Sequence, residues 1–322
     1  MARVAIVGSG FIGRAWAISF ARAGHDVVLW DQDPDAPRRA IDFAASVAAD
    51  LAKNDLLAGN DPQVVLARLR AEKTLAAALA DADHVQENAP ERLDLKKSLF
   101  AELDHLAPPG AVLASSSSAI LPSLFTEQLP HRKRCLVIHP INPPYLIPAV
   151  EVVPAPWTSP EIIERARAFL VAAGQAPIVM KRELDGFVMN RMQGALLEEA
   201  FRLVADGFAT TEDIDVGIRE GLALRWSFMG PFETIDLNAP AGVRDYVQRY
   251  EGIYSNIFKQ TQRRADWAGP VLAQIERERR GKLRADQLGE LVDASPVPRD
   301  ESRLRHRPPL RAPRGQRTGS GS

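Results

Sequence analysis

The chain has 322 residues, of which 46% are hydrophobic and 25% are charged, enough for two globular domains with a substantial core. Its 40 lysines and arginines nearly balance 41 aspartates and glutamates, and the net charge of −1 offers no overall attraction to nucleic acid or to an anionic membrane. The single cysteine, Cys135, excludes a disulfide framework and a multi-cysteine metal site, and it favours a reducing, cytoplasmic location.

Short apolar runs alternate with helical patterns through the first half of the chain. The expected strands are residues 4–7, 27–30, 84–86, 111–114, 136–138, 150–153 and 177–180. The expected helices in this half are residues 12–23, 35–57 and 93–106. Such an alternation predicts an α/β fold, with a parallel, doubly wound sheet of Rossmann type that carries helices on both faces.

Beyond this half, the pattern changes to long helical segments, at residues 187–206, 211–220, 241–259 and 269–280. We therefore expect a Rossmann domain over residues 1–184 and an all-helical domain over residues 185–295. Residues 299–322 hold seven arginines and two acids, a local charge of +5 that leaves −6 for the rest of the chain. Because residues 296–322 are rich in proline, glycine and arginine, they predict a disordered basic tail, to which we assign no function.

A glycine-rich motif, Gly8-Ser-Gly-Phe-Ile-Gly13, joins the first expected strand to the first expected helix. In this context Gly8 permits a tight turn, Gly10 lets the backbone approach a pyrophosphate, and Gly13 lets the helix and strand pack closely. The diphosphate of a dinucleotide would lie at the helix N-terminus. The cofactor-binding residues predicted in this loop are Gly8, Gly10, Phe11, Ile12 and Gly13.

Asp31 ends the second expected strand, 23 residues after Gly8. A carboxylate at this place accepts hydrogen bonds from the ribose hydroxyls of the adenosine half and repels a 2′-phosphate, which favours NAD over NADP. The glycine pattern alone is compatible with an ordinary surface turn. The strand, the helix and the acid in register favour a cofactor site instead.

His139 is the one histidine whose surroundings suggest chemistry. It follows the apolar residues 136–138, so it is expected at the carboxyl edge of the sheet, where doubly wound folds bind ligands. Glu151 lies 12 residues later among valines, and a carboxylate buried there needs a partner such as an imidazolium. The two residues can form a base with its orienting acid, although a hydrogen-bonded structural histidine and a solvent-facing carboxylate remain the alternative.

Serines 115–118 follow another expected strand end, where hydroxyl groups can contact ligand oxygens. Serine runs usually form loops, and no G-x-S-x-G elbow surrounds this one, so a hydrolytic nucleophile is not expected. The chain also contains no H-E-x-x-H motif, paired cysteines or EF-hand loop, and we propose no metal site.

These motifs occur in the order seen in a known family. From about residue 4 to about residue 285, the chain resembles the lambda-crystallin branch of the 3-hydroxyacyl-CoA dehydrogenase superfamily, whose members include L-gulonate 3-dehydrogenase. The segment Gln86-Glu-Asn-Ala-Pro-Glu-Arg-Leu-Asp-Leu-Lys-Lys97 resembles a family motif, which implies that Glu91 and Lys96 contact the cofactor. The resemblance also implies a homodimer, in agreement with helical segments that carry more apolar residues than one small domain needs.

The resemblance implies a role for each residue of the predicted site. The family's catalytic residues fall on Ser118, His139, Glu151 and Asn190, and its substrate-binding asparagine falls on Asn142. His139 would take the proton of the C3 hydroxyl while hydride passes to NAD, and Glu151 would fix the imidazole. Ser118 and Asn190 would hold the reacting oxygen by hydrogen bonds.

The stretch 139–148 is similar to the crystallin branch, whereas fatty-acid enzymes of the superfamily usually have aromatic residues after the histidine. This favours a small polyol acid over an acyl-CoA, and L-gulonate is the leading candidate. Asn142, Lys96 and Arg225 are candidates to bind the substrate carboxylate. Two alternative substrates stay open, namely a short-chain L-3-hydroxyacyl-CoA and L-carnitine or another hydroxy acid. A third alternative is that the protein is a noncatalytic structural protein of crystallin type. From Pro296 onward the chain departs from the charged helix that ends its relatives, which puts dimer contacts of that helix in doubt.

Overall fold

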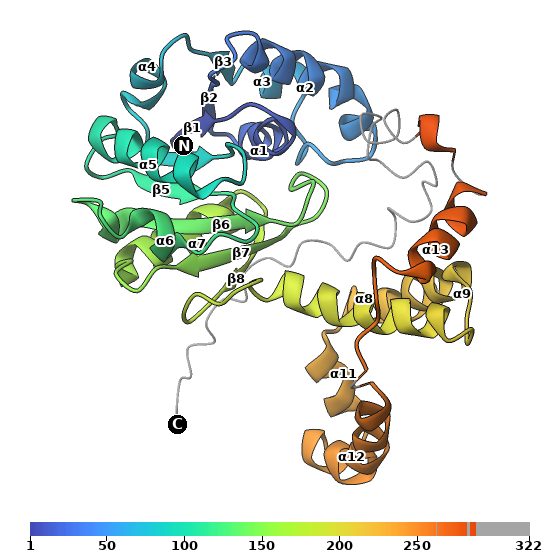
Figure 1. Cartoon of the computed structure of the whole chain (residues 1–322). Coiled ribbons are helices and arrows are strands. Elements are labelled where there is room, and N and C mark those ends of the chain that lie inside the picture. The colour runs from blue at the N-terminus through green and yellow to red at the C-terminus, as the bar shows by residue number, and fades with distance from the viewer. Residues whose placement is uncertain (262, 282–283, 288–322) are drawn as a thin grey trace, which may run out of the picture. The chain divides into compact units, whose positions relative to one another are not determined.

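The computed structural model describes residues 1–261, 263–281 and 284–287 (Figure 1). The predicted basic tail, residues 296–322, lies outside these residues. The chain divides into two compact units, of which the first is Met1–Asn190 and the second begins at Arg191. The domain boundary proposed after residue 184 therefore falls six residues before this division.

The first unit is built on one eight-stranded sheet with the strand order β3-β2-β1-β4-β5-β6-β7-β8. The strands are β1 (Arg3–Val7), β2 (Asp26–Trp30), β3 (Leu69–Ala71), β4 (His84–Glu87), β5 (Val112–Ser115), β6 (Cys135–Pro140), β7 (Ala149–Pro154) and β8 (Ala176–Val179). From β3 to β6, neighbouring strands are parallel, and the order reverses direction beside β1, which confirms the predicted Rossmann-type, doubly wound fold.

The sheet differs from the expected parallel arrangement at β7, which runs antiparallel to β6. A parallel crossover needs about a dozen residues or more, usually with a helix, and residues 141–148 are too few for one. The chain therefore turns back on itself, and the start of β7 lies beside the end of β6. β8 then pairs parallel to β7 after the crossover helix α7 (Pro160–Ala172).

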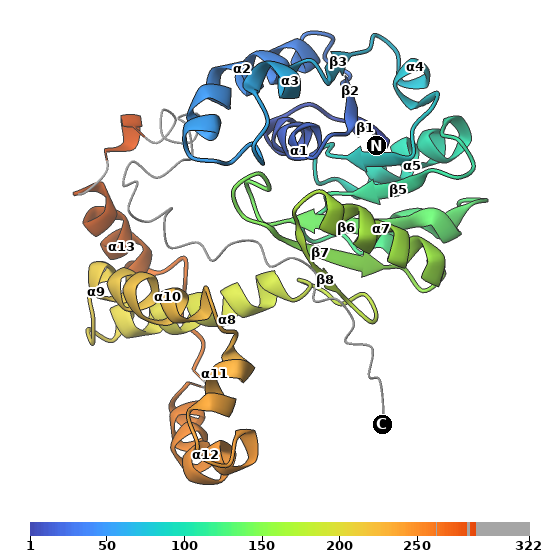
Figure 2. The ribbon, with the colours of Figure 1, turned by 180° about the vertical axis from the view of Figure 1, so that it is seen from behind.

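Helices cover both faces of the sheet, because successive strand residues point to opposite sides. Val4 and Ile6 of β1 belong to one apolar cluster, and Ala5 and Val7 belong to another. The first cluster includes residues of α1 (Phe11–Arg22), α2 (Ala36–Lys53), α3 (Pro62–Leu66) and α7, and the second includes residues of α4 (Leu75–Leu79), α5 (Leu93–Leu106) and α6 (Pro122–Thr126). Figures 1 and 2 show the two faces from opposite sides.

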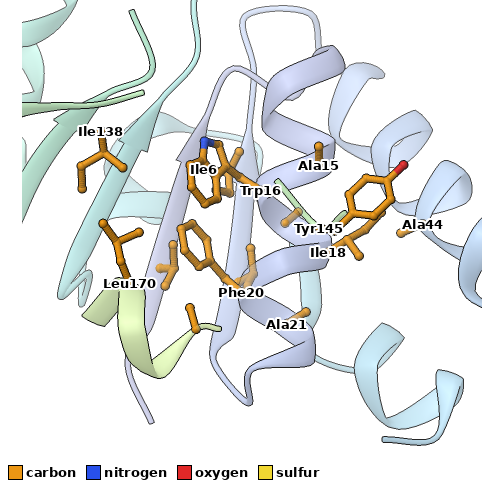
Figure 3. Packing of buried hydrophobic residues seen from close by; sticks show 14 of the residues in the cluster. Ile6, Ala15, Trp16, Ile18, Phe20, Ala21, Ala44, Ile138, Tyr145 and Leu170 are labelled. Carbon is orange, nitrogen blue, oxygen red and sulfur yellow. The ribbon is translucent and has the colours of Figure 1, made fainter. Parts of the chain in front are cut away.

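Two stacked aromatic rings of α1 lie in the centre of the first cluster. Trp16 and Phe20 are one helical turn apart, and their ring centroids are separated by 4.8 Å. Both side chains are fully buried, beside Ile6 and Ile138 of the sheet and Leu170 of α7 (Figure 3). This packing fixes α1 on the sheet, and the N-terminus of α1 carries the glycine motif.

The described part of the second unit is helical, as predicted. Its elements are the rest of α8 (Met189–Ala205), α9 (Thr211–Val216), a π-helix at Gly217–Leu222, α10 (Ala223–Trp226), α11 (Pro231–Leu237), α12 (Val243–Gln260), α13 (Pro270–Arg280) and a 3-10 turn at Ala285–Gln287. Among the described residues of the whole chain, no helix is long and apolar enough to cross a membrane.

His84, the first residue of β4, lies in the core and is 2% exposed. Its ring stacks on Phe169 at 4.5 Å between centroids, and Nε2 lies 3.0 Å from Oε1 of Gln86. Burial disfavours the imidazolium and lowers the pKa of His84 to about 4. The protein core therefore contains a histidine that is neutral at pH 7.

We expect this histidine to make the fold acid-sensitive. Because its folded pKa of about 4 lies below the ordinary value of 6.5, its contribution to stability is complete above pH 6.5 and is lost as the pH falls towards 4. Replacing His84 with phenylalanine keeps a ring in the core and removes the titration. Urea unfolding at several pH values measures the free energy of unfolding. Between pH 6.5 and pH 4, this free energy should fall by about 3 kcal/mol more in the wild type than in His84→Phe. Parallel losses in the two proteins would contradict the assignment.

Candidate active site

The reversal of the chain at β7 brings His139 and Glu151 together as a directly opposed cross-strand pair. Nδ1 of His139 lies 2.8 Å from Oε2 of Glu151. Glu151 is completely buried, and His139 is 8% exposed, so the imidazole is the member of the pair that solvent or a ligand can reach. The predicted partnership of these two residues is present in the structure.

The second oxygen of Glu151 accepts two backbone hydrogen bonds, from the N–H groups of Val188 at 2.7 Å and Met189 at 2.9 Å. Burial alone would raise the pKa of Glu151, but the hydrogen bonds from His139, Met189 and Val188 outweigh it and lower the pKa below its ordinary value. Glu151 is therefore an acceptor only, and it fixes the imidazole tautomer with the proton on Nδ1. This leaves Nε2 of His139 as the ring atom that can take a proton from a ligand.

Ser118 and Asn190 lie in contact through the serine backbone. The side-chain amide of Asn190 donates to the carbonyl oxygen of Ser118 at 2.7 Å. Ser118 itself is exposed, so its hydroxyl can meet a ligand. Residues 188–190 thus contact two separate parts of the candidate site, the Glu151 carboxylate and the loop after β5.

Glu91 organises that loop. Its Oε1 accepts hydrogen bonds from the hydroxyl of Ser117 at 2.6 Å and from the backbone N–H groups of Ser118, Ala119 and Ile120 at 3.0 to 3.2 Å. Burial opposes its ionisation, but the hydrogen bonds and the nearby Lys96 hold the pKa of Glu91 below its ordinary value. Four donors on one oxygen fix the backbone that presents Ser118.

Lys96 is buried, with 1% of its side chain exposed. Its Nζ lies 3.0 Å from Glu87, which is also buried, and 3.7 Å from Glu91. Glu87 is not among the residues predicted for the site, although a carboxylate at the end of an apolar strand and nine residues before a lysine is a signal for such an ion pair. The predicted contacts of Glu91 and Lys96 with the cofactor stay predictions.

The glycine loop has the geometry that a dinucleotide requires. Gly8 has a φ of +89°, and a Cβ at this residue would lie 2.9 Å from the backbone of Asn88. A Cβ at Gly13 would lie 1.9 Å from the carbonyl oxygen of Gly8. A Cβ at Gly10, in contrast, would meet no described atom within 4 Å, so its space is available to a ligand that approaches the backbone.

Asp31 lies beside this loop, and its Oδ2 accepts a hydrogen bond from the backbone N–H of Ser9 at 2.6 Å. The first turn of α1 has no side-chain cap, so its N–H groups are suited to bind a diphosphate. Phe11 is 43% exposed at the loop, and Ile12 is partly buried. The residues present therefore fit NAD.

The remaining predicted ligand contacts come from two different units. Asn142 is exposed in the connection between β6 and β7, three residues after His139. Arg225 is exposed on α10 in the second unit. Lys96 is already paired with Glu87 and buried. The predicted contacts of Asn142, Lys96 and Arg225 with a substrate carboxylate stay predictions.

Family models agree with this arrangement over most of the chain. Residues 3–183 match the model described as 3-hydroxyacyl-CoA dehydrogenase, NAD binding domain, and residues 186–269 match the model described as 3-hydroxyacyl-CoA dehydrogenase, C-terminal domain.

The chain is also similar to individual proteins over most of its length. The lambda-crystallin of Oryctolagus cuniculus is 39% identical over 284 residues, covering 88% of this chain and 89% of that relative. An L-carnitine dehydrogenase of Pseudomonas sp is 42% identical over 247 residues, covering 76% of each chain. Among solved structures, the NAD⁺-dependent 5-formyl-3-hydroxy-2-methylpyridine 4-carboxylic acid 5-dehydrogenase has a TM-score of 0.70 at 28% identity and covers 80% of this chain and 81% of its own.

The two neighbouring glycines Gly10 and Gly13 give a matched test of the loop. We expect Gly10→Ala to unfold close to the wild-type temperature and to bind NADH at least about tenfold more weakly, because its methyl group enters only the ligand's space. We expect Gly13→Ala to lose about 1 to 3 kcal/mol of stability, because its methyl group overlaps Gly8. Thermal unfolding and NADH fluorescence titration measure both effects, and an equally stable Gly13→Ala would contradict the packing argument.

Proposed function

This chain belongs to the 3-hydroxyacyl-CoA dehydrogenase family, and from that premise we propose that it oxidises the C3 hydroxyl of a small 3-hydroxy acid, with L-gulonate as the first candidate. As a member of the family it is an NAD-dependent oxidoreductase. The observation that carries the finer proposal is the His139–Glu151 pair, in which a buried, ionised carboxylate holds Nδ1 of a ligand-accessible imidazole at 2.8 Å.

In this proposal, His139 is the general base. Nε2 takes the proton from the C3 hydroxyl, and the imidazolium that forms is stabilised by Glu151. When bound at the glycine loop, NAD supplies the hydride acceptor for C3. Because the same imidazolium returns its proton in the reverse direction, the pair serves oxidation and reduction equally.

Ser118 and Asn190 are proposed to hold the reacting oxygen. The amide of Asn190 donates to the Ser118 carbonyl, which supports a shared position for the two residues. Asn142, three residues after His139, is proposed to bind the substrate close to the base. Gly8, Gly10, Phe11, Ile12, Gly13 and Asp31 are proposed to bind the cofactor, together with Glu91 and Lys96.

L-Carnitine is the second candidate substrate, since relatives named L-carnitine dehydrogenase are as similar to this chain as the lambda-crystallins are. Short-chain L-3-hydroxyacyl-CoA is the alternative that the family's own name suggests. A noncatalytic role of crystallin type is disfavoured by the intact His139–Glu151 pair. We keep a cytoplasmic location as a proposal that rests on the single cysteine.

The proposal is tested by following NADH formation with L-gulonate, L-carnitine, L-3-hydroxybutyrate and L-3-hydroxybutyryl-CoA as substrates, each with NAD and with NADP. We expect the highest kcat/KM for L-gulonate with NAD. A higher value for the acyl-CoA would overturn the choice of substrate, and no turnover of any of them would count against the reaction itself.

Two variants in the same assay separate catalysis from structure. A positioned general base contributes about 10² to 10⁴ in rate, so His139→Gln should lower kcat by at least about two orders of magnitude and leave NADH affinity unchanged. Glu151→Gln should also lower kcat, and the double variant should lose much less than the product of the two separate losses, because the residues act as one unit. Wild-type turnover in His139→Gln would show that the histidine is structural.

We further propose that the protein is a homodimer that associates through its second unit. None of residues 243–259 of α12 is buried, although the helix carries one apolar face. This face consists of Val243, Val247, Tyr250, Ile253, Tyr254, Ile257 and Phe258, which are 38 to 61% exposed. An isolated amphipathic helix gains its stability from packing, so a partner for this face is expected, and a second copy supplies an identical apolar stripe.

Sedimentation velocity at micromolar concentration should therefore give a mass near twice 35.3 kDa. Changing Ile253 and Ile257 to glutamate should shift the protein towards the monomer, because each carboxylate would be desolvated in the interface. Changing the exposed Val64 on the first unit to glutamate is the matched control and should leave the mass unchanged. A monomeric wild type would contradict the proposal.

A further inference from the structure

The turn that precedes α8 has an uncommon backbone conformation at two consecutive residues. Gly186 has a φ of +74° and Phe187 a φ of +49°, both in the left-handed region. Glycine adopts such angles freely, but a bulky L-residue rarely does, because its Cβ crowds the following carbonyl. Phe187 is one of three residues other than glycine that have a positive φ in the described part of the chain.

The two peptide groups that follow this turn point at one atom. The N–H groups of Val188 and Met189 donate to Oε1 of Glu151 at 2.7 and 2.9 Å. The other oxygen of that carboxylate holds Nδ1 of His139 at 2.8 Å. The conformation of the turn therefore decides how Glu151, and through it His139, is oriented.

The ring of Phe187 supplies what keeps an L-residue in this conformation. The side chain is completely buried in the second apolar cluster, and its ring centroid lies 5.6 Å from that of His139. Withdrawing the ring from the strained geometry would expose this apolar surface to water. Burial of the ring and the left-handed backbone are therefore linked, and the same ring limits the movement of the imidazole.

We propose that Phe187 is a positioning residue for His139. Its buried ring holds a left-handed turn, and the turn directs two N–H groups at Glu151, so that the carboxylate keeps Nδ1 of the imidazole in place. This inference rests on the proposed function in one respect, which is that His139 is the base. The geometry of the turn itself does not depend on the reaction.

A residue that merely fills the core predicts a different outcome from a residue that holds a turn. If Phe187 only fills space, Phe187→Gly lowers the stability of the fold at least as much as Phe187→Ala does, because glycine is smaller by a methyl group. If Phe187 holds the turn, Phe187→Ala lowers the stability more than Phe187→Gly does. Alanine retains the backbone strain of an L-residue in the left-handed region but lacks the ring whose burial offsets that strain. Glycine needs no ring to remain left-handed.

Phe100 provides the matched control. It is equally buried in the same cluster but lies in the middle of helix α5, where alanine is favoured over glycine. At Phe100, the alanine variant should therefore unfold at a higher temperature than the glycine variant. At Phe187 we expect the reverse order.

Proton NMR of the full-length protein reads the position of the imidazole directly. The Nδ1–H proton of His139, hydrogen-bonded to a buried carboxylate, should give a far-downfield resonance, assigned by its loss in His139→Gln. We expect the resonance to persist in Phe187→Gly and in both Phe100 variants, and to disappear in Phe187→Ala through exchange with water. Its persistence in Phe187→Ala would overturn the proposal, and so would its loss in Phe187→Gly.

Kinetics with L-gulonate and NAD give the second readout. A misplaced base lowers the rate more than it lowers binding, so kcat of Phe187→Ala should be about 10- to 100-fold below that of Phe187→Gly, with KM changed by less than about threefold. Equal kcat values in two folded variants would count against a positioning role.

Gly186→Ala keeps the ring and strains the same turn, so it tests the proposal even if Phe187→Ala does not fold. It should also lose the downfield resonance, and a retained resonance would contradict the role of the turn. If the wild type oxidises no 3-hydroxy acid, the proposed function fails, while the NMR comparison still decides whether Phe187 positions the imidazole.

Discussion

The candidate site depends on how one fully buried carboxylate is satisfied. Glu151 lies among valines with no exposed surface, where an unpaired negative charge would cost several kcal/mol. Three donors resolve this, the imidazole of His139 and two backbone N–H groups that follow Phe187. They come from β6 and from the segment that opens α8, so the carboxylate joins two parts of the chain that are separated by almost fifty residues. The site and the fold are therefore stabilised by the same contacts.

Features that depend on neighbouring residues in the sequence could be predicted. The glycine spacing, Asp31 at a strand end and the burial of Glu151 beside a histidine follow from local pattern and from the cost of burying charge. Features set by tertiary contacts could not. The direction of β7, the ion pair of Glu87 with Lys96 and the left-handed backbone of Phe187 depend on which segments meet in space, and no periodicity encodes this.

Two further acids, Glu87 and Glu91, are paired within the chain as Glu151 is. Glu87 ends β4 and is neutralised by Lys96, and Glu91 is held by donors of the loop after β5. Both acids are thus held by donors of the chain itself. Such groups need little reorganisation during a reaction, which is the condition under which fixed dipoles and charges stabilise developing charge best.

The proposed function assigns positioning and recognition to different residues. Glu151 and Phe187 are buried, whereas Ser118 and Asn142 are exposed on loops. Under the proposed function, a change in the exposed residues would alter ligand recognition without leaving a buried charge unpaired, whereas a change in the buried residues would misplace His139. Relatives of similar identity carry different names, lambda-crystallin and L-carnitine dehydrogenase, and one fold can support different functions through changes in its loops. If His139 is the base, the buried pair would serve the oxidation of any secondary hydroxyl at this site, and the proposed function would then place substrate choice in the loops that follow β5 and β6.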